Sequence, residues 1–316
     1  MPCPQNKDLL KNNIKIDLFS NQDKRKNMCY FLTHAHKDHM KGLERWYSGK
    51  GTIYCTETTA QLVIFQTYNW KTPLKMKDFK IIKYNSKYDL SSRKVSVWAI
   101  PSYHCDGSCM FLFKVNHSLI LYTGDFRFHK SMRENKLLMY NNIDKLYFDD
   151  TFYDVILPNF PTLQDSVETL TAVLDRLTLP IYINSAILGV EPLLRNVAKK
   201  LDIKFSISKH IEDYRAKQIF YLMDEYIVED SPFILGDRKE DDISKRNWVF
   251  PTCTHFLCDK EKNKKKKRNH TYVWYSTHPD REENERLIAL TGSMSTIPIP
   301  CNHNVGELDC NKKSLK

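Results

Sequence analysis

No run of apolar residues in this chain of 316 residues approaches the roughly 20 residues that a membrane-spanning helix needs. The first residues, MPCPQNKDLLKNNIK, carry charges without an apolar segment after them, so they lack the pattern of a secretory signal. The nine cysteines are odd in number and scattered, and their spacing does not suggest a disulfide framework. We therefore expect a soluble protein of a reducing compartment, the cytoplasm or the nucleus, with no membrane association.

Negative charge is the scarcer sign, because 38 Asp and Glu residues stand against 48 Lys and Arg, for a net charge of +10. A basic excess of this size suggests a polyanionic partner, most often nucleic acid. A solvated lysine-rich surface without such a partner would give the same net charge. Part of the excess lies in the run DKEKNKKKKRNH at 259–270, which cannot pack into a core. The run has three interpretations: a solvated loop, an arm that contacts phosphates, or a nuclear-import signal.

Short apolar runs separated by polar turns fill the first 155 residues, and several of them are followed at once by His or Asp. Their length and composition predict buried strands at 28–33, 95–100, 110–115, 118–123 and 145–149. This pattern is typical of a sheet whose strand ends and loops supply a functional site.

The pattern of apolar residues changes from about residue 160, where segments with helical spacing alternate with segments typical of strands. The expected elements are a helix at 163–177 capped by Thr162, a strand at 180–184, a helix at 190–201, a strand at 203–207, a helix from about 210 and a last helix at 281–292. Alternation of this kind predicts a parallel sheet covered by helices. We take 156–277 as a second module inserted into the first.

Four ligand-type side chains crowd the stretch FLTHAHKDHMKGL: His34, His36, Asp38 and His39. In an extended segment residues two apart point the same way, so His34 and His36 can bind one metal ion together. Asp38 and His39 would then face a second position as the chain turns. Imidazole and carboxylate are ligands of zinc and similar divalent ions. Two such ions roughly 3.5–4 Å apart can activate a water and hold a phosphate.

Two further blocks complete the candidate metal site. PSYHCDGSCMFLF places His104 between two predicted strands, and ILYTGDFRF places Asp125 just after a third. Gly124 gives the backbone room for a sharp turn at that point. A carboxylate at Asp125 has two oxygens and could bridge both ions. Each residue alone has an ordinary structural explanation, but four His and two Asp at strand ends predict a metal centre.

The order His-x-His-x-Asp-His, then a single His, then TGD, resembles the metallo-β-lactamase fold. More narrowly, YFLTHAHKDHMKGL, HCDGSCMFLF, ILYTGDFR and LYFDDTF resemble the β-CASP nucleases of DNA cross-link and double-strand-break repair, the Artemis and Apollo group. The resemblance covers 10–155 well, the insert weakly and 272–300 moderately. It implies an α/β metallo-β-lactamase αββα sandwich made of 1–155 and 278–316, with a β-CASP insert of parallel sheet and helices at 156–277.

The resemblance also implies roles for single residues. The implied metal ligands are His34, His36, Asp38, His39, His104 and Asp125. The implied catalytic residues are Asp17, which orients ligands from behind the site, Asp38, Asp149 and His278. Asp150 is the weaker candidate beside Asp149. His278, in VWYSTHPD, would bind the second metal, touch the phosphate or protonate the leaving oxygen.

The implied function is hydrolysis of DNA phosphodiesters in the nucleus, at single-stranded, hairpin or overhang ends. It would use one or two zinc ions, with magnesium or manganese possible at the second site. Two alternatives stay open: a catalytically weak or inactive DNA-binding relative, and an RNA-processing β-CASP nuclease. A small-molecule metallo-hydrolase shares the ligand pattern, but the insert, the basic charge and His278 argue against it. Protein partners are not predicted.

The chain departs from the group at several positions. His278-Pro279-Asp280 stands for His-Ser-Ser, Gly189-Val190-Glu191 for Gly-Lys-Glu, and Asp106 for Pro. A carboxylate at Asp280 would repel a 5′ phosphate, which makes endonuclease cleavage relatively more favoured than 5′-phosphate-dependent trimming.

The resemblance to this group also implies that the insert can carry a second, structural zinc site. The residues that suggest it are Cys253, His255 and Cys258, completed by His210 or His270. The alternative is that these side chains are unrelated, because they contain no clear Cys-x-x-Cys pair.

Overall fold

The computed structural model describes residues 4–19, 27–46, 51–139, 141–155, 159–237, 246–257 and 269–299. These residues form two compact units, one with the residues up to 155 and from 277 onward, the other with those from 159 to 276. Cys258 and most of the basic run at 259–270 lie outside the described residues. That the second unit is a β-CASP insert stays a prediction.

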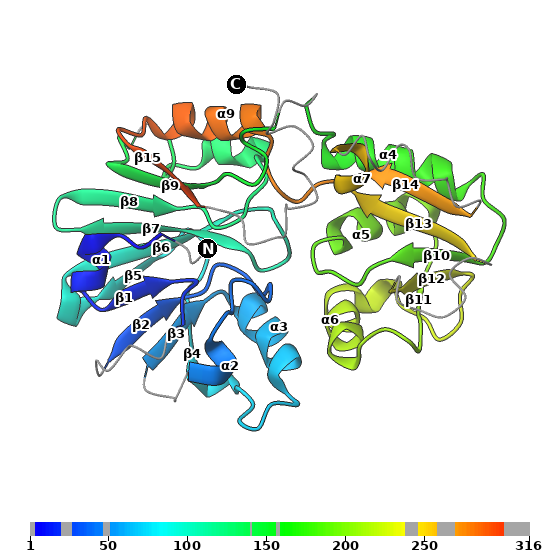
Figure 1. Cartoon of the computed structure of the whole chain (residues 1–316), viewed down its shortest axis with the longest axis horizontal. Helices are drawn as coiled ribbons and strands as arrows, with labels where there is room; N and C mark the ends of the chain where they lie inside the picture. Colours follow the sequence, from blue (N-terminus) through cyan, green and yellow to red (C-terminus); the bar gives the residue numbers. More distant parts are fainter. Residues whose placement is uncertain are drawn as a thin grey trace, which may run out of the picture. The chain divides into compact units, whose positions relative to one another are not determined.

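The first unit contains two sheets (Figure 1). The four-stranded sheet is entirely parallel and has the order β1 (Ile14–Ile16), β2 (Met28–Phe31), β3 (Gly51–Cys55), β4 (Phe79–Ile81). The six-stranded sheet is mixed and has the order β15 (Thr296–Ile299), β9 (Lys145–Asp149), β8 (Ser118–Tyr122), β7 (Cys109–Val115), β6 (Val95–Pro101), β5 (Lys87–Leu90). Its helices are α1 (Lys7–Lys11), α2 (Leu43–Trp46), α3 (Glu57–Thr67) and α9 (Arg281–Thr291), with short 3-10 turns at Met76–Asp78, Ser91–Arg93 and Lys130–Glu134.

The two sheets of the first unit pack face to face through aromatic side chains. Phe31 of β2 lies edge-on to Phe111 and Phe113 of β7, with ring centroids 5.1 and 4.9 Å apart. The other face of the six-stranded sheet buries Leu112 against Leu287 of α9. α3 contacts β4 of the four-stranded sheet. Both sheets are therefore buried on both faces, which explains why β2 and β7 read as nearly continuous apolar runs.

The second unit is one parallel sheet with helices around it. Its strands, in spatial order, are β11 (Ser206–Ile207), β12 (Phe233–Gly236), β10 (Ile181–Asn184), β13 (Asn247–Thr252) and β14 (His270–Trp274). Its helices are α4 (Leu163–Leu174), α5 (Glu191–Leu201), α6 (Asp213–Met223) and α7 (Thr254–Leu257), with a 3-10 turn at Asp224–Tyr226. Leu170, Leu194 and Ile219 of three helices join Ile183 and Val249 of the strands in one core.

Most predicted elements are present, and some of them begin or end at other residues than expected. Thr162 caps α4 as expected, in a reciprocal pair with Asp165, but the helix ends at Leu174 rather than 177. The strand expected at 203–207 forms a ladder over two residues only, and α6 begins at Asp213 rather than near 210. α3 was not predicted, because its sequence ETTAQLVIFQT is rich in β-branched residues that favour strands. None of the described helices is long and apolar enough to cross a membrane.

Candidate metal centre

The candidate ligands lie where strands of both sheets end. β7 is antiparallel to β6 and β8, and β8 is parallel to β9, so β6, β8 and β9 end at the same edge of their sheet. His104 follows β6, Asp125 follows β8, and Asp149 is the last residue of β9. In the parallel four-stranded sheet, Asp17 follows β1 and His34 follows β2. The fold thus gathers residues that are distant in the sequence.

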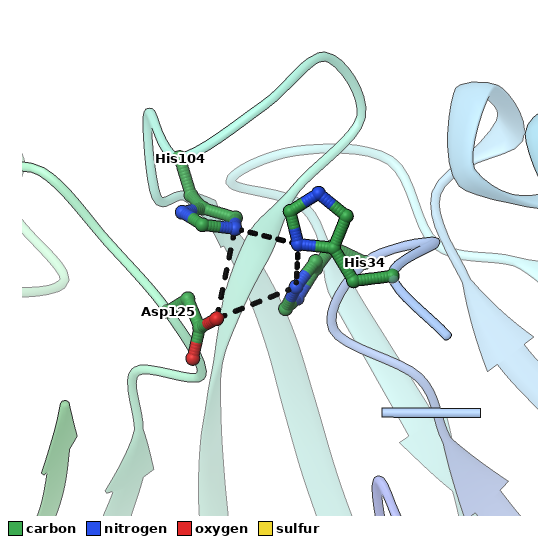
Figure 2. A group of neighbouring side chains, drawn as sticks. His34, His104 and Asp125 are labelled. Atoms are coloured by element: carbon green, nitrogen blue, oxygen red, sulfur yellow. Dashed lines mark hydrogen bonds and ion pairs between the residues drawn. The ribbon is translucent and has the colours of Figure 1, made fainter. Parts of the chain in front are cut away.

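Three imidazoles and one carboxylate converge in the first group (Figure 2). Nδ1 of His36 lies 3.0 Å from Nε2 of His34 and 3.0 Å from Nε2 of His104. Oδ2 of Asp125 lies 3.6 Å from Nε2 of His34 and 3.6 Å from Nε2 of His104. The four ligand atoms all lie within 4.8 Å of one another. His34, His104 and Asp125 are buried.

These separations fit a shared cation. Ligands about 2.0–2.1 Å from a tetrahedral zinc ion lie about 3.3–3.4 Å from one another, between the 3.0 and 3.6 Å found here. Nδ1 of His104 donates to a backbone carbonyl and Nδ1 of His34 to the hydroxyl of Thr33, so that in the neutral rings Nε2 of both presents a lone pair to the cluster. The donor set of three nitrogens and one oxygen is one that zinc and similar ions accept. The buried group is therefore able to hold a metal ion.

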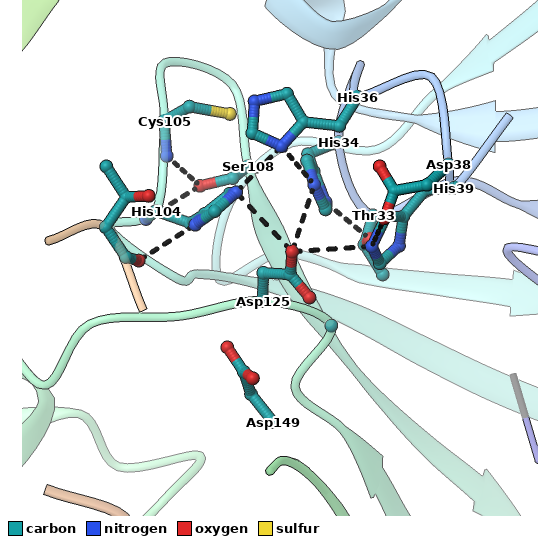
Figure 3. A network of polar contacts seen from close by, with 12 residues as sticks. Thr33, His34, His36, Asp38, His39, His104, Cys105, Ser108, Asp125 and Asp149 are labelled. Atoms are coloured by element: carbon teal, nitrogen blue, oxygen red, sulfur yellow. Dashed lines mark hydrogen bonds and ion pairs between the residues drawn. The ribbon is translucent and has the colours of Figure 1, made fainter. Parts of the chain in front are cut away.

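Oδ2 of Asp125 is the centre of the whole cluster (Figure 3). Besides the two imidazoles already named, it lies 3.4 Å from Nε2 of His39 and 3.8 Å from Nδ1 of His278. The atom is buried, and no donor among the described residues hydrogen-bonds to it. A second group that could hold a metal, formed by Asp125, Asp149 and His278, shares this carboxylate. A buried carboxylate oxygen without a hydrogen bond, surrounded by imidazoles, is suited to a bridging ligand.

His278 and Asp149 form a closed hydrogen-bonded pair at the second group. Nδ1 of His278 lies 2.9 Å from Oδ2 of Asp149, and it is 3.3 Å from the hydroxyl of Thr151. The other oxygen of Asp149 accepts hydrogen bonds from the hydroxyl and the backbone N–H of Thr151, at 2.5 and 3.0 Å. Asn284 of α9 donates to the backbone carbonyl of Asp149 at 2.9 Å. These contacts fix the positions of both side chains.

Asp17 supports the cluster from behind. Its Oδ2 lies 2.8 Å from Nδ1 of His39 and accepts a hydrogen bond of 2.7 Å from the hydroxyl of Thr33. The hydroxyl of Thr33 in turn lies 2.9 Å from Nδ1 of His34. One carboxylate thereby orients two imidazoles, whose opposite nitrogens face Asp125. Asp38, on the same loop, has Oδ2 3.5 Å from Nε2 of His39.

Backbone contacts hold the loops that carry the ligands. The hydroxyl of Ser108 accepts hydrogen bonds from the N–H groups of His104 and Cys105, both at 3.2 Å. Nδ1 of His104 bonds to the carbonyl of Thr277 at 2.8 Å, which leaves Nε2 directed at the cluster. Gly124 has φ +55°, and a Cβ there would lie 2.8 Å from side-chain atoms of Thr33, so this position requires glycine.

The histidines of the site differ in the direction in which their surroundings shift the pKa. Burial lowers the pKa of His34 and of His104 well below the ordinary value, and neighbouring imidazoles add to the shift. Burial alone would also lower the pKa of His39, but Asp125 and Asp17 outweigh it and raise that pKa well above the ordinary value. His34 and His104 are therefore neutral and present lone pairs, as metal ligands must.

The pKa values of His278 and Asp125 are also set by burial against the neighbouring charges. Burial lowers the pKa of His278, but Asp149 and Asp125 outweigh it and the pKa is raised. Burial raises the pKa of Asp125, yet His39 and His278 hold it well below its usual range. Asp125 is therefore a carboxylate in the folded protein.

The structure brings all nine predicted site residues together in the first unit. Asp150, the weaker alternative to Asp149, is only half-buried. Sequence reasoning missed Thr33, Thr151 and Asn284, which position the predicted residues. Thr33 and Thr151 stand beside or two positions from a predicted site residue, but their type alone carries no signal of this role.

Two carboxylates in the segments that depart from the group, Asp280 and Glu191, have structural partners here. The departure in the second segment is Val190, where the group has Lys, and Glu191 matches the group. Asp280 is the N-cap of α9, and its side chain accepts a hydrogen bond of 2.8 Å from the N–H of Glu283. Glu191 is fully buried in the second unit, where it pairs with Arg215 and accepts a hydrogen bond of 2.8 Å from the N–H of Gly189. Both carboxylates therefore stabilise local structure.

The suggested structural zinc site stays a prediction. Cys258 lies outside the described residues, and His210 is exposed. The ring of His255 stacks on Tyr272 with a centroid distance of 3.7 Å, and His270 packs against Phe250 at 5.0 Å.

The chain has a metallo-β-lactamase-like fold, and its first unit carries a candidate metal centre. No family model matches the chain. A solved structure of a protein of unknown function from Enterococcus faecalis V583 superposes with a TM-score of 0.62 at 16% identity, covering 89% of this chain and 77% of that one. The predicted metallo-β-lactamase fold class is confirmed.

The sequence relatives are more specific than the fold. The chain is 31% identical over 222 residues to human Protein artemis, covering 62% of this chain and 32% of that protein. It is 28% identical over 282 residues to the 5′ exonuclease Apollo of Danio rerio, covering 86% and 48%, and 26% identical to the mouse Apollo, covering 93% and 54%. The match thus spans about a third to a half of these relatives. The predicted resemblance to the Artemis and Apollo group is confirmed.

Proposed function

We propose that this protein is a metal-dependent DNA nuclease that hydrolyses phosphodiesters during cross-link or double-strand-break repair in the nucleus. The main support is the position of Oδ2 of Asp125. This atom is buried without a hydrogen bond, and it belongs to both groups of side chains that could hold a metal ion. The relatives named Protein artemis and 5′ exonuclease Apollo support the reaction class. The net charge of +10 supports a polyanionic substrate.

The residues present suit zinc at the first group, held by His34, His36, His104 and Asp125. At the second position, Asp38 and His39 or Asp149 and His278 would serve beside Asp125, and zinc, magnesium or manganese fits these donors. Bound ions would lower the pKa of a nearby water and offset charge that builds on the phosphate.

Other side chains of the site would orient the ligands and move a proton. Asp17 and Thr33 hold His39 and His34 in orientation, which keeps their inner nitrogens directed at Asp125. His278 can carry a proton because Asp149 and Asp125 raise its pKa, and Asp149 accepts the Nδ1 hydrogen bond. A protonated His278 would act on the substrate either by contacting the phosphate or by donating a proton to the leaving 3′ oxygen.

End-labelled DNA cleavage tests the proposal. Single-stranded, hairpin and overhang DNA, each with a 5′ phosphate or a 5′ hydroxyl, would be incubated with zinc-, magnesium- or manganese-loaded protein. The wild type is expected to cut at least one of these, and the Asp38→Ala variant is expected to lose cleavage. Asp89→Ala removes an exposed carboxylate of β5 and serves as the matched control.

The same assay separates the two modes of cutting. A requirement for the 5′ phosphate together with mononucleotide products would indicate an exonuclease. Internal cuts that are indifferent to the 5′ end would indicate an endonuclease. Folded, metal-loaded protein that binds DNA and leaves every substrate intact would contradict the proposal and favour a DNA-binding relative without activity. Cleavage of RNA in preference to DNA would favour the RNA-processing alternative.

A further inference from the structure

An exposed aromatic residue directly precedes one of the candidate metal ligands in the chain. Tyr103 immediately precedes His104, and it is 40% exposed although it is a large aromatic side chain. Its backbone has φ +58°, in the left-handed region that bulky residues rarely occupy. Strain of this kind persists only where the surroundings impose it, and it concentrates at functional sites.

Tyr103 is held in place by two residues of the neighbouring loop. Its ring stacks on His129 with a centroid distance of 4.3 Å and an interplanar angle of 24°. The hydroxyl of Tyr103 hydrogen-bonds to Ser131, whose hydroxyl lies 2.7 Å from Nδ1 of His129. The N–H of Ser131 also donates to that nitrogen, so Nδ1 is an acceptor. His129 and Ser131 together fix the plane of the Tyr103 ring.

The two loops that carry this pair are those that carry two of the metal-centre residues. His104 is the next residue after Tyr103, and Asp125 lies four positions before His129. The backbone N–H of Arg127 donates to the carbonyl of Ser102 at 2.9 Å, and this hydrogen bond joins the loop after β6 to the loop after β8. The aromatic pair and two of the metal-centre residues therefore lie on loops that are hydrogen-bonded to each other.

We propose that Tyr103, backed by His129, is a stacking platform for an unpaired nucleobase next to the phosphodiester that is cut. The proposal rests on the proposed nuclease function. Among the described residues, His129 is the one ring that contacts Tyr103, so stacking covers a single face of it. A flat exposed ring favours a base because every base has a π face, and sequence is not read by such contacts. Partial burial and Lys130 lower the pKa of His129, which keeps the supporting ring neutral.

An abasic scan tests the platform. Single-stranded oligonucleotides would each carry one abasic nucleotide, moved stepwise across the site of cutting, and kcat/KM would be measured for each. In the wild type, one position is expected to lower kcat/KM by about 5- to 150-fold, the range of one stacked base. The Tyr103→Gly variant is expected to show that loss already on normal DNA and no further loss at the abasic position.

The variants separate stacking from a structural role. Glycine tolerates φ +58°, so Tyr103→Gly is expected to fold, and its melting temperature checks this. Tyr103→Phe keeps the ring, loses the bond to Ser131 and is expected to retain the wild-type abasic profile. A role in loop structure alone would change the melting temperature of Tyr103→Gly but leave its abasic profile like that of the wild type, which would overturn the proposal.

Binding distinguishes failure of the platform from failure of the nuclease function. The same oligonucleotides would be titrated by fluorescence anisotropy against metal-loaded Asp38→Ala protein, with and without Tyr103→Gly. A position-specific loss of affinity that disappears with Tyr103→Gly supports the platform even if no DNA is cut. Cleavage by the wild type with a flat abasic profile in both assays would refute the platform while leaving the nuclease function standing.

Discussion

Nδ1 of His278 lies 2.9 Å from Oδ2 of Asp149, although the two residues are 129 positions apart in the chain. Asp149 ends β9, and His278 stands just before α9. Asn284 in the first turns of α9 donates to the carbonyl of Asp149, and Asp280 caps the helix. The start of α9 is thereby tied to the end of β9, which brings His278 to the candidate metal centre.

The central role of Asp125 predicts a large effect of a small change. Asp125→Asn keeps the volume but removes the charge from the oxygen that faces four imidazoles. Metal affinity is expected to fall by more than the about 10- to 100-fold that a supporting residue costs. Zinc content after gel filtration, measured by mass spectrometry of the metal, checks this. Asp89→Asn is the matched control, and zinc content equal to the control would contradict the prediction.

Asp17 is expected to act through the residues it orients. Asp17→Asn leaves the backbone unstrained, because Asn tolerates the φ of +48° found at this position. Its weaker hold on His39 and Thr33 should lower metal affinity by about 10- to 100-fold. Cleavage should therefore return when the zinc concentration is raised. A loss of cleavage that excess zinc does not restore would show that Asp17 does more than position ligands.

Metal binding is expected to release protons near neutral pH. In metal-free protein the pKa of His39 is raised, because Asp125 and Asp17 outweigh its burial. Its contribution to folding stability is complete below the unfolded pKa of about 6.5 and is lost as the pH rises through the folded pKa. A ligand must be deprotonated, so about one proton should leave His39 when an ion binds. Calorimetric zinc titrations at pH 7 in two buffers of different ionisation enthalpy measure this, and equal apparent enthalpies would refute it.

Asp280 is expected to stabilise the protein as a helix cap. Asp280→Ala removes the acceptor for the N–H of Glu283 and should lower the free energy of unfolding by about 0.5–2 kcal/mol. Asp280→Ser keeps a capping oxygen and should stay close to the wild type. Urea unfolding of the two variants measures the difference. Equal stability of Ala and Ser variants would mean that the capping bond does not contribute.

Much of the fold could be predicted from the sequence because its signals are local. β2 and β6 to β9 are apolar runs of strand length, and Thr162 precedes an amphipathic pattern as a cap should. α3 could not be predicted, since the β-branched residues of ETTAQLVIFQT favour strands and its helical state depends on packing near β4.

The candidate site was predictable to the extent that its residue types are unusual. His34, His36, Asp38 and His39 stand close enough in the chain to indicate a metal on their own. Thr33 and Asn284 have no such signal, because their roles lie in hydrogen bonds to Asp17 and Asp149, 16 and 135 residues away. Asp280 was interpreted from its charge alone, and its capping bond becomes visible only when α9 is in place.

Stepwise reconstitution with zinc tests the central claim most directly. Chelator-treated protein would receive zinc in measured equivalents, and bound zinc and cleavage of end-labelled DNA would be followed in the same samples. We predict no cleavage without zinc and a rise in cleavage over the first one or two equivalents, absent in Asp125→Asn. Cleavage that persists in zinc-free protein, or folded protein that binds zinc and cuts no DNA, would contradict the account.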